Sequence, residues 1–274
     1  MIAQSSETQW PDKVNLFGLD VSVVDYDRAC EKVIKAAQQK QPAVVSCHAA
    51  HAVVTFSGDK ELRDMANQFQ MITPDGQPVR WAMNWLHRTK LRDRVYGPEL
   101  MRRVCSAAAK QGVKIFLYGG ASVEALDQLE TKLEENHPGI DIAGKFSPPF
   151  RELTDSERAD VLRQIADSGT QIVFIGLGCP KQDIFAFKNR NEIQGVQMCV
   201  GAAFDFHAGA KKMAPRWMQA TGTEWIFRLV QEPGRLWKRY LVTNSQFVWR
   251  VVKQTLFGKP KSQDKSVQGA DEPA

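Results

Sequence analysis

The chain has 274 residues, of which 43% are hydrophobic and 24% are charged, and its formal net charge at pH 7 is +5. This composition is typical of a globular protein with a sizeable core and excludes overall disorder. The cysteines lie far apart and form no C-x-x-C pair, so the sequence indicates neither a disulfide framework nor a zinc knuckle. They are Cys30, Cys47, Cys105, Cys179 and Cys199.

No segment has the pattern of a targeting or membrane-spanning sequence. Residues 1–12 are polar and lack the basic start and apolar run of a secretory signal. No stretch approaches the ~18 uninterrupted apolar residues that a transmembrane helix needs. Scattered single cysteines are typical of a reducing compartment. We therefore expect a cytoplasmic protein.

Short β-rich runs alternate with helical stretches along most of the chain. Strands are expected at residues 44–47, 69–73, 113–118, 140–146, 172–177 and 197–204, after an opening hairpin or edge strand at 14–24. Helices are expected at residues 27–40, 51–66, 77–87, 98–111, 122–136, 154–168 and 180–193. This alternation predicts an α/β fold with a mostly parallel sheet flanked by helices.

The C-terminal segment differs from the rest of the chain in its charge. Residues 209–257 hold nine basic residues against two acidic ones, whereas residues 1–208 sum to −2. Such asymmetry favours an anionic partner, either a lipid surface or a nucleic acid. We expect an α/β core at 1–213, a helical basic and aromatic appendage at 214–257, and a disordered tail at 258–274.

Glycine and polar residues follow five of the expected strands. They are Ser46-Cys47-His48, Thr73-Pro74-Asp75-Gly76, Gly119-Gly120, the segment 176–182 and Phe204-Asp205-Phe206-His207. In an open α/β sheet, ligands bind at the carboxyl ends of the strands. These residues are therefore expected to converge on one crevice.

Asp75 lies in a Pro-Asp-Gly turn between an expected strand and an expected helix. Such turns are common, and an aspartate there can simply cap the following helix. Its place at the ligand-binding edge of the sheet also fits a general base. The motif alone leaves both roles open.

The segment 176–182, with the sequence GLGCPKQ, joins an apolar strand to a helix. Glycines there allow a phosphate to approach the backbone, and the free N–H groups of a helix start favour anions. The spacing matches neither G-x-G-x-x-G nor a P-loop. A phosphate site and a plain tight turn are equal alternatives for this segment.

Three short patterns resemble metal-ligand spacings. The D-x-D at residues 25–27 is followed at once by a helix, which favours a capping role. His48 with His51, and Asp205 with His207, lack a further ligand at a matched spacing. We therefore predict polar lining of a pocket at these positions and no metal.

Residues 233–257 have the periodicity of an amphipathic helix. Its polar, mostly basic side is formed by Arg235, Lys238, Arg239, Gln246, Arg250 and Lys253, and its apolar side by Trp237, Tyr240, Leu241, Phe247, Val248, Val251 and Val252. Aromatic and basic side chains together suit an anionic membrane surface. The alternative is a helix packed on the core with a solvated basic face.

Several motifs occur along the chain in the order found in the WecG/TagA/CpsF family, also called glycosyltransferase family 26. They are Val44-Val45-Ser46, Pro74-Asp75-Gly76, RVYGPEL at 94–100, FLYGG at 116–120, GLGCPKQ at 176–182, GAAFDF at 201–206, APRW at 214–217 and EWIFRL at 224–229. The chain resembles this family from about residue 14 to residue 257.

The resemblance implies a Rossmann-like core and a C-terminal appendage that associates with the membrane. It also implies an inverting, metal-independent transfer of a sugar from a UDP-sugar to a polyprenyl-diphosphate-linked saccharide in surface polysaccharide synthesis. The sugar would be of the N-acetylmannosamine type, a hexose or a uronic acid. The implied location is cytoplasmic and peripheral, on the inner face of an anionic membrane. No cofactor and no nucleic acid are expected, and a homo-oligomer is left open.

The resemblance gives catalytic roles to Asp75 as the base, to Ser46 in the first strand-end loop, and to Arg94 at the donor. Substrate contacts are expected from His48, Gly119, Gly176, Gly178, Gln182, Gly201, Asp205, Arg228, Arg235 and Arg239. Arginine suits the diphosphate because its planar fork matches phosphate oxygens.

The chain departs from the family pattern beside the expected crevice. Many members have Thr-x-Asn where this chain has the sequence Ser-Cys-His at 46–48. Glu99 stands where aspartate is common in the family, and Asp183 stands where glutamate is usual. These differences bear on the donor sugar and the acceptor rather than on the reaction class.

Two other functions are compatible with parts of the pattern. A nucleotide-cofactor oxidoreductase would explain the glycine turns, but G-x-G-x-x-G with an acidic residue ~20 positions later is absent from the sequence. A non-catalytic membrane or nucleic-acid adaptor would explain the basic helix alone.

Overall fold

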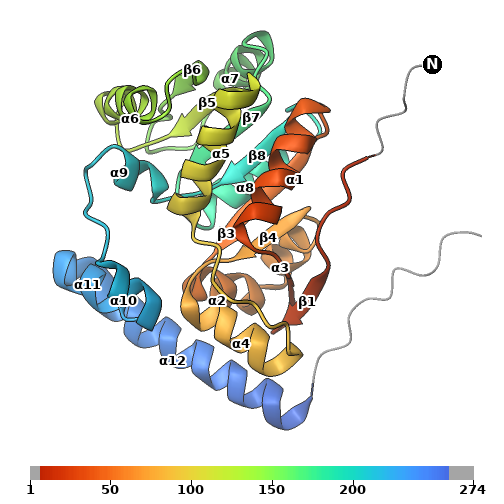
Figure 1. Ribbon diagram of the computed structural model, residues 1–274, viewed down its shortest axis with the longest axis vertical. Helices are drawn as coiled ribbons and strands as arrows, with labels where there is room; N and C mark the ends of the chain where they lie inside the picture. Colours follow the sequence, from red (N-terminus) through yellow and green to blue (C-terminus); the bar gives the residue numbers. More distant parts are fainter. Residues whose placement is uncertain (1–6, 259–274) are drawn as a thin grey trace, which may run out of the picture.

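The computed structural model describes residues 7–258 and has a six-stranded sheet at its centre (Figure 1). The strands are β3 (Ala43–His48), β4 (Met71–Pro74), β5 (Lys114–Gly119), β6 (Asp141–Phe146), β7 (Ile172–Gly176) and β8 (Val196–Cys199). Their order is β4-β3-β8-β7-β5-β6, and every neighbouring pair is parallel. The predicted α/β fold with a mostly parallel sheet is confirmed.

A separate antiparallel hairpin of β1 (Lys13–Leu16) and β2 (Leu19–Ser22) opens the chain, as expected. The helices of the core are α1 (Tyr26–Gln38), α2 (Ala50–Gly58), α3 (Lys60–Ala66), α4 (Gln77–His87), α5 (Gly97–Gln111), α6 (Val123–Asn136), α7 (Asp155–Asp167), α8 (Lys181–Lys188) and α9 (Ala203–His207). The chain continues into α10 (Arg216–Thr221), α11 (Glu224–Gln231) and α12 (Pro233–Phe257).

Several expected elements have different bounds in the structure, and the helix expected at 180–193 ends at Lys188. The single helix expected at 51–66 is two helices, because Asp59 is extended and its side chain accepts a hydrogen bond of 3.0 Å from Leu62 N to cap α3. The strand expected at 197–204 ends at Cys199, and the apolar residues that follow begin α9. Continuous apolar runs do not distinguish a buried strand from a buried helix, which explains the error in this strand.

The central strands β3, β8, β7 and β5 are buried on both faces, so most of their residues are apolar, whereas the edge strand β6 is partly exposed. Successive residues of β3 point to opposite sides: Val45 joins the core beneath α1, α5, α6 and α9, and Val44 joins the core beneath α2, α3, α4, α7 and α8. The parallel register brings the carboxyl ends of β3 and β4 to the same edge, with His48 opposite Pro74. This edge holds the turn that carries Asp75.

Helix α12 lies across the ends of α2 and α4 (Figure 1). Phe247 packs edge-on against Phe17 of the β1–β2 turn with ring centroids 5.3 Å apart. The side chain of Gln254 accepts a hydrogen bond from Phe17 N at 3.0 Å and donates one to Asn15 O at 3.0 Å. The helix is therefore docked on the core through side-chain contacts.

The docked face of α12 differs from the apolar side that its periodicity predicts. Arg250 hydrogen-bonds Ser57 of α2 and Gln254 is buried, so polar residues contribute to the interface. Trp237, Leu241 and Val248 are instead exposed. The surface of α2 and of the β1–β2 turn contains polar groups, so the side of α12 that contacts it is partly polar. Part of the apolar side of α12 is therefore left exposed.

Within residues 7–258, no helix combines the length and the apolar character needed to span a bilayer. The side chains of Arg235 and Arg239 and the tail beyond residue 258 lie outside what the structure describes. The division of the chain into a core, an appendage and a tail, with boundaries at residues 213 and 257, stays a prediction.

Replacing Phe247 by Ala should destabilise the protein by about 3–5 kcal/mol, the usual effect of removing a buried aromatic ring. Trp249 lies on the same helix but is 64% exposed, whereas Phe247 is 4% exposed. Trp249→Ala should therefore change the free energy of unfolding by less than ~0.5 kcal/mol. Urea unfolding of both variants tests the docking of α12, and equal effects would contradict it.

Candidate active site

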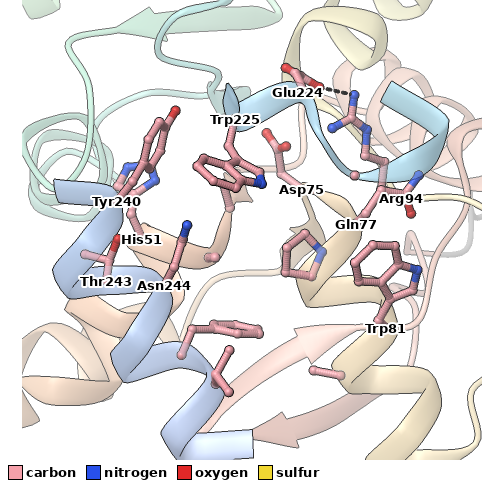
Figure 2. Close-up of a pocket in the computed structure, with 18 of the residues that line it drawn as sticks. His51, Asp75, Gln77, Trp81, Arg94, Glu224, Trp225, Tyr240, Thr243 and Asn244 are labelled. Atoms are coloured by element: carbon pink, nitrogen blue, oxygen red, sulfur yellow. Dashed lines mark hydrogen bonds and ion pairs between the residues drawn. The ribbon is translucent and has the colours of Figure 1, made fainter. Parts of the chain in front are cut away.

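A pocket of about 490 Å³ lies between the turn after β4, helices α2 and α4, and the C-terminal helices α11 and α12. Figure 2 shows Asp75, Arg94 and Glu224 near one end of this pocket. Trp85, Val248 and Val252 also line it and give it an apolar part. The pocket thus joins the carboxyl edge of the sheet to the segment that the sequence marks as basic and aromatic.

Asp75 is fixed by backbone contacts on both sides. Its N–H donates to His48 O at 3.2 Å, which ties the turn to the end of β3. Its carboxylate accepts a hydrogen bond of 3.2 Å from the N–H of Gly97, the first residue of α5. The residue that precedes α4 is Gly76, with a φ of 97° and no side-chain cap. Asp75 therefore does not cap the helix that follows it, which was the alternative role for this motif.

Burial and the neighbouring arginines have opposite effects on the pKa of Asp75. Burial raises the pKa of its carboxyl above the ordinary value, and the nearby Arg94 and Arg228 guanidinium groups act in the lowering direction without reversing the shift. A carboxylate whose pKa is raised is a better proton acceptor than one on the surface. The position therefore suits a general base.

Arg94 and Arg228 share one carboxylate. Arg94 Nη2 donates to Glu224 Oε2 at 2.5 Å, and Arg228 Nη2 lies 2.8 Å from Glu224 Oε1. Burial acts to raise the pKa of Glu224, but Arg228 and Arg94 hold it below its ordinary value. Glu224 is therefore a buried, ionised carboxylate at the pocket wall.

Tyr96 lies between the two arginines. The Arg94 guanidinium is 4.4 Å from the centre of its ring, and that of Arg228 is 5.6 Å from it. Its hydroxyl accepts a hydrogen bond of 2.7 Å from Arg228, and its N–H donates to the Tyr26 hydroxyl at 3.0 Å. Tyr96 thus helps to fix both cations at the pocket.

The opposite wall of the pocket is formed by polar and aromatic side chains. Figure 2 shows His51 of α2, Trp225 of α11, and Tyr240, Thr243 and Asn244 of α12 on this wall. Aromatic rings beside hydroxyl and amide groups are well suited to contact a sugar, since they offer both apolar area and hydrogen bonds.

The sequence prediction did not include Tyr96, Glu224 or the wall on α12. The sequence held two signals for these residues. Tyr96 lies two positions after Arg94, and Glu224 lies four positions before Arg228, which is the spacing of an ion pair on a helix. The wall on α12 could not be found from sequence, because its partners lie almost two hundred positions away in α2.

Ser46 and His48 lie outside the pocket lining. Both are buried, with exposures of 0% and 1%, and both contact the buried Asp183. Ser46 Oγ donates to Asp183 Oδ1 at 2.5 Å, and His48 Nε2 lies 3.1 Å from the same oxygen. This contact joins the end of β3 to α8. The structure thus gives these two residues a packing contact, and their expected roles in substrate binding stay predictions.

The glycines expected to approach a phosphate differ in their surroundings. A Cβ at Gly119 would lie 2.7 Å from the backbone of Gly176, and a Cβ at Gly176 would lie 2.5 Å from the ring of Phe204. These two glycines are required by packing. Gly178 has a φ of 77° and open space where a Cβ would stand, so its backbone conformation rather than packing favours glycine there.

Gln182 and Gly201 are neighbours in the same region. The Gln182 side chain is buried and accepts a hydrogen bond of 3.2 Å from Gly178 N. A Cβ at Gly201 would lie 3.2 Å from the Gln182 oxygen. Asp205 pairs with Lys211 at 2.7 Å, and Lys211 also pairs with Glu232 at 3.1 Å. This group lies at the carboxyl edge of the sheet but outside the pocket that holds Asp75.

The capping role predicted for Asp25 is confirmed, since its side chain accepts a hydrogen bond of 2.9 Å from Arg28 N at the start of α1. Asp27 pairs with Arg103 at 2.6 Å. Across the described part of the chain, no three His, Cys, Asp or Glu side chains are arranged to hold a metal ion.

Comparison with known proteins gives the chain its class. Residues 14–261 match the glycosyl transferase WecG/TagA/CpsF family. The N-acetylglucosaminyldiphosphoundecaprenol N-acetyl-beta-D-mannosaminyltransferase of Bacillus subtilis (strain 168) is 31% identical over 229 residues, which cover 81% of this chain and 86% of that protein. The chain is therefore a glycosyltransferase. It belongs to the WecG/TagA/CpsF family, as its motifs predicted.

The family match does not favour the two other functions that the sequence allowed. An oxidoreductase would bind a dinucleotide at the strand-end glycines, whereas the family that the chain matches is one of glycosyl transferases. A simple adaptor does not need a buried carboxylate with two arginines beside it in a pocket.

Proposed function

We propose that this glycosyltransferase moves one sugar from a UDP-sugar to a polyprenyl-diphosphate-linked N-acetylglucosamine. The proposal follows the relative from Bacillus subtilis, whose name states an undecaprenyl-diphosphate-linked acceptor and an N-acetylmannosaminyl group. The transferred sugar is then of the N-acetylmannosamine type, with a hexose or a uronic acid as the alternatives. The product belongs to the synthesis of a surface polysaccharide.

The observation that carries the proposal is the division of the pocket into a charged end and an apolar end. Asp75, Arg94 and Arg228 lie at the charged end, and Trp85 and Val252 lie at the apolar end. A lipid-linked saccharide has the same division, with a sugar and diphosphate at one end and a hydrocarbon chain at the other. A water-soluble sugar acceptor would leave the apolar end of the pocket unused.

In the proposed reaction, an acceptor hydroxyl oxygen attacks the anomeric carbon of the donor sugar. The new C–O bond forms on one face as the bond to the UDP oxygen breaks on the other, so the configuration inverts. Asp75 takes the hydroxyl proton as the bond forms. UDP leaves with the electron pair of the broken bond.

The leaving diphosphate gains negative charge, which fixed cations stabilise without reorganisation. Arg94 and Arg228 are the cations beside Asp75 that can meet this charge. In this scheme the arginines perform the task that a divalent metal performs in other transferases, so the reaction needs no metal.

The exposed apolar strip on α12 supports a peripheral location at a membrane. Trp237, Leu241, Val248 and Trp249 are exposed there, and Lys238 lies among them. Tryptophan and basic residues together bind interfaces, and each lysine or arginine near an anionic surface adds about 1 kcal/mol. The enzyme would then work on the inner face of the cell membrane, where lipid-linked intermediates are accessible.

A transfer assay tests the proposal directly. The enzyme is incubated with single UDP-sugars and polyprenyl-diphosphate-linked N-acetylglucosamine, and the product is weighed by mass spectrometry. We expect one sugar to be added, with the highest rate for N-acetylmannosamine. We also expect the rate to survive EDTA, because no step uses a metal. Complete loss with EDTA, restored by magnesium or manganese, would contradict the metal-independent scheme.

Asp75→Asn keeps the shape of the side chain but removes the base, so turnover should fall by roughly 10²–10⁴-fold while UDP still binds. In the wild type, turnover should fall as the pH drops through the raised pKa of Asp75, which lies above the ordinary value for aspartate. Asp59→Asn, which alters only the cap of α3, should keep normal turnover. Near-normal turnover of Asp75→Asn would eliminate Asp75 as the base.

The same variant should be at least as stable as the wild type. Because the pKa of Asp75 is raised in the folded protein, folding favours its protonated form, and stability falls as the pH rises from the unfolded value of about 4 towards the raised one. Removing the charge should therefore raise the melting temperature at neutral pH. A loss of activity caused by unfolding would appear as a lower melting temperature.

Trp237→Ser with Trp249→Ser should weaken sedimentation with anionic vesicles and spare transfer to a water-soluble acceptor analogue. Both side chains are exposed, so their loss leaves the docking of α12 intact. Val123→Ser, on the exposed surface of α6, is the matched control and should not change vesicle binding. Unchanged sedimentation of the double variant would refute membrane docking through this strip.

A further inference from the structure

Glu224 is the first residue of α11 and has 6% of its surface exposed. Each oxygen of its carboxylate contacts a different arginine: Oε2 accepts from Arg94 at 2.5 Å, and Oε1 lies 2.8 Å from Arg228 Nη2. Arg94 precedes α5 in the core, whereas Arg228 is one turn further along α11. One carboxylate therefore sets the distance between two guanidinium groups that come from different parts of the chain.

The four charged groups at this end of the pocket balance when Asp75 is ionised. Arg94 and Arg228 supply two positive charges, and Asp75 and Glu224 supply two negative ones. Ions removed from water are stabilised only when they are paired in good geometry. Glu224 satisfies this need for both arginines while no phosphate is present, and thus keeps them at the pocket wall.

We propose that Glu224 is the positioning residue of this site, which holds Arg94 and Arg228 as a fixed pair for the diphosphate and sets the charge that Asp75 experiences. The proposal rests on the proposed function, in which a diphosphate is the leaving group. It assigns Glu224 no contact with the reacting atoms. Its effect is transmitted through the two arginines and through the field at Asp75.

The charge balance changes in the direction that the reaction needs. When Asp75 takes the proton of the acceptor hydroxyl, the group of four side chains goes from neutral to a charge of about +1, since one carboxylate is neutralised. The leaving UDP gains negative charge in the same step. Proton transfer and stabilisation of the leaving group thus support each other, provided that Glu224 remains ionised.

Other titratable groups around Asp75 do not supply this balance. They are Tyr26 of α1, Cys47 of β3, Tyr96 before α5 and His51 of α2. Burial raises the pKa of Cys47 to about 12, and burial also raises the pKa of Tyr26 and of Tyr96 above that of Cys47. These three groups are therefore neutral through the working range of pH, and an imidazole such as that of His51 carries no negative charge in either protonation state. Glu224 is thus the carboxylate that acts on Asp75.

Glu224→Gln tests the proposal because it keeps the size of the side chain and removes the charge. We expect kcat/KM for the UDP-sugar to fall about 10- to 100-fold, the effect of losing hydrogen bonds to charged groups. We also expect the acid limb of the pH–rate profile to move to lower pH, because Glu224 acts to raise the pKa of Asp75 and the arginines act to lower it.

Glu157→Gln is the matched control. Glu157 also pairs with an arginine, Arg151 at 2.6 Å, but near the start of α7 and away from the pocket. It should leave kcat/KM and the acid limb unchanged. A fall in activity for Glu224→Gln with an unmoved acid limb would overturn the proposal and reduce Glu224 to an anchor of α11.

Glu224→Asp separates the effect of the negative charge from the effect of side-chain length. It also replaces Glu224→Gln as the test if that variant does not fold. It keeps the carboxylate but withdraws it by one methylene group. We expect an unmoved acid limb with a reduced kcat/KM. A wild-type kcat/KM would overturn the positioning role, and an acid limb shifted as expected for Glu224→Gln would overturn the charge role. Failure of the proposed function itself would look different, since the wild type would then transfer no sugar from any UDP-sugar.

Discussion

The contact between Arg94 and Glu224 joins the two parts of the protein that form the site. Arg94 belongs to the α/β core and Glu224 to the C-terminal helices, and their side chains meet 2.5 Å apart in a buried position. Breaking a buried pair by removing one partner leaves an uncompensated charge, so the pair constrains both parts strongly. Arg228 contacts the same carboxylate and Tyr96 contacts both arginines, so the arrangement of this charged group beside Asp75 depends on the pair.

The sequence predicted those features that depend on residues close together in the chain. Alternation of strands and helices predicted the parallel sheet, and strand-end position placed Asp75 at the ligand-binding edge. Arg94 and Arg228 were found through the family motifs, and both line the pocket.

The sequence could not predict what tertiary packing decides. Ser46 and His48 lie in the last three positions of β3, close to the turn of Asp75, yet their side chains contact the buried Asp183. Nothing near them in the sequence reveals this partner, which lies more than 130 positions away. Similarly, the periodicity of α12 identified two faces, but the face that docks is set by the polar groups of α2 and the β1–β2 turn.

The contacts of Gln254 with Phe17 and Asn15 span 237 and 239 positions of the sequence. A chain emerging from the ribosome can form the sheet and the turn of Asp75 long before α12 exists, because those contacts are more local. The pocket wall on α12 is added only after the strands of the sheet have been made. A growing chain that has not yet reached α12 therefore has Asp75 in place but lacks an enclosed pocket, so the complete pocket exists only once α12 has docked.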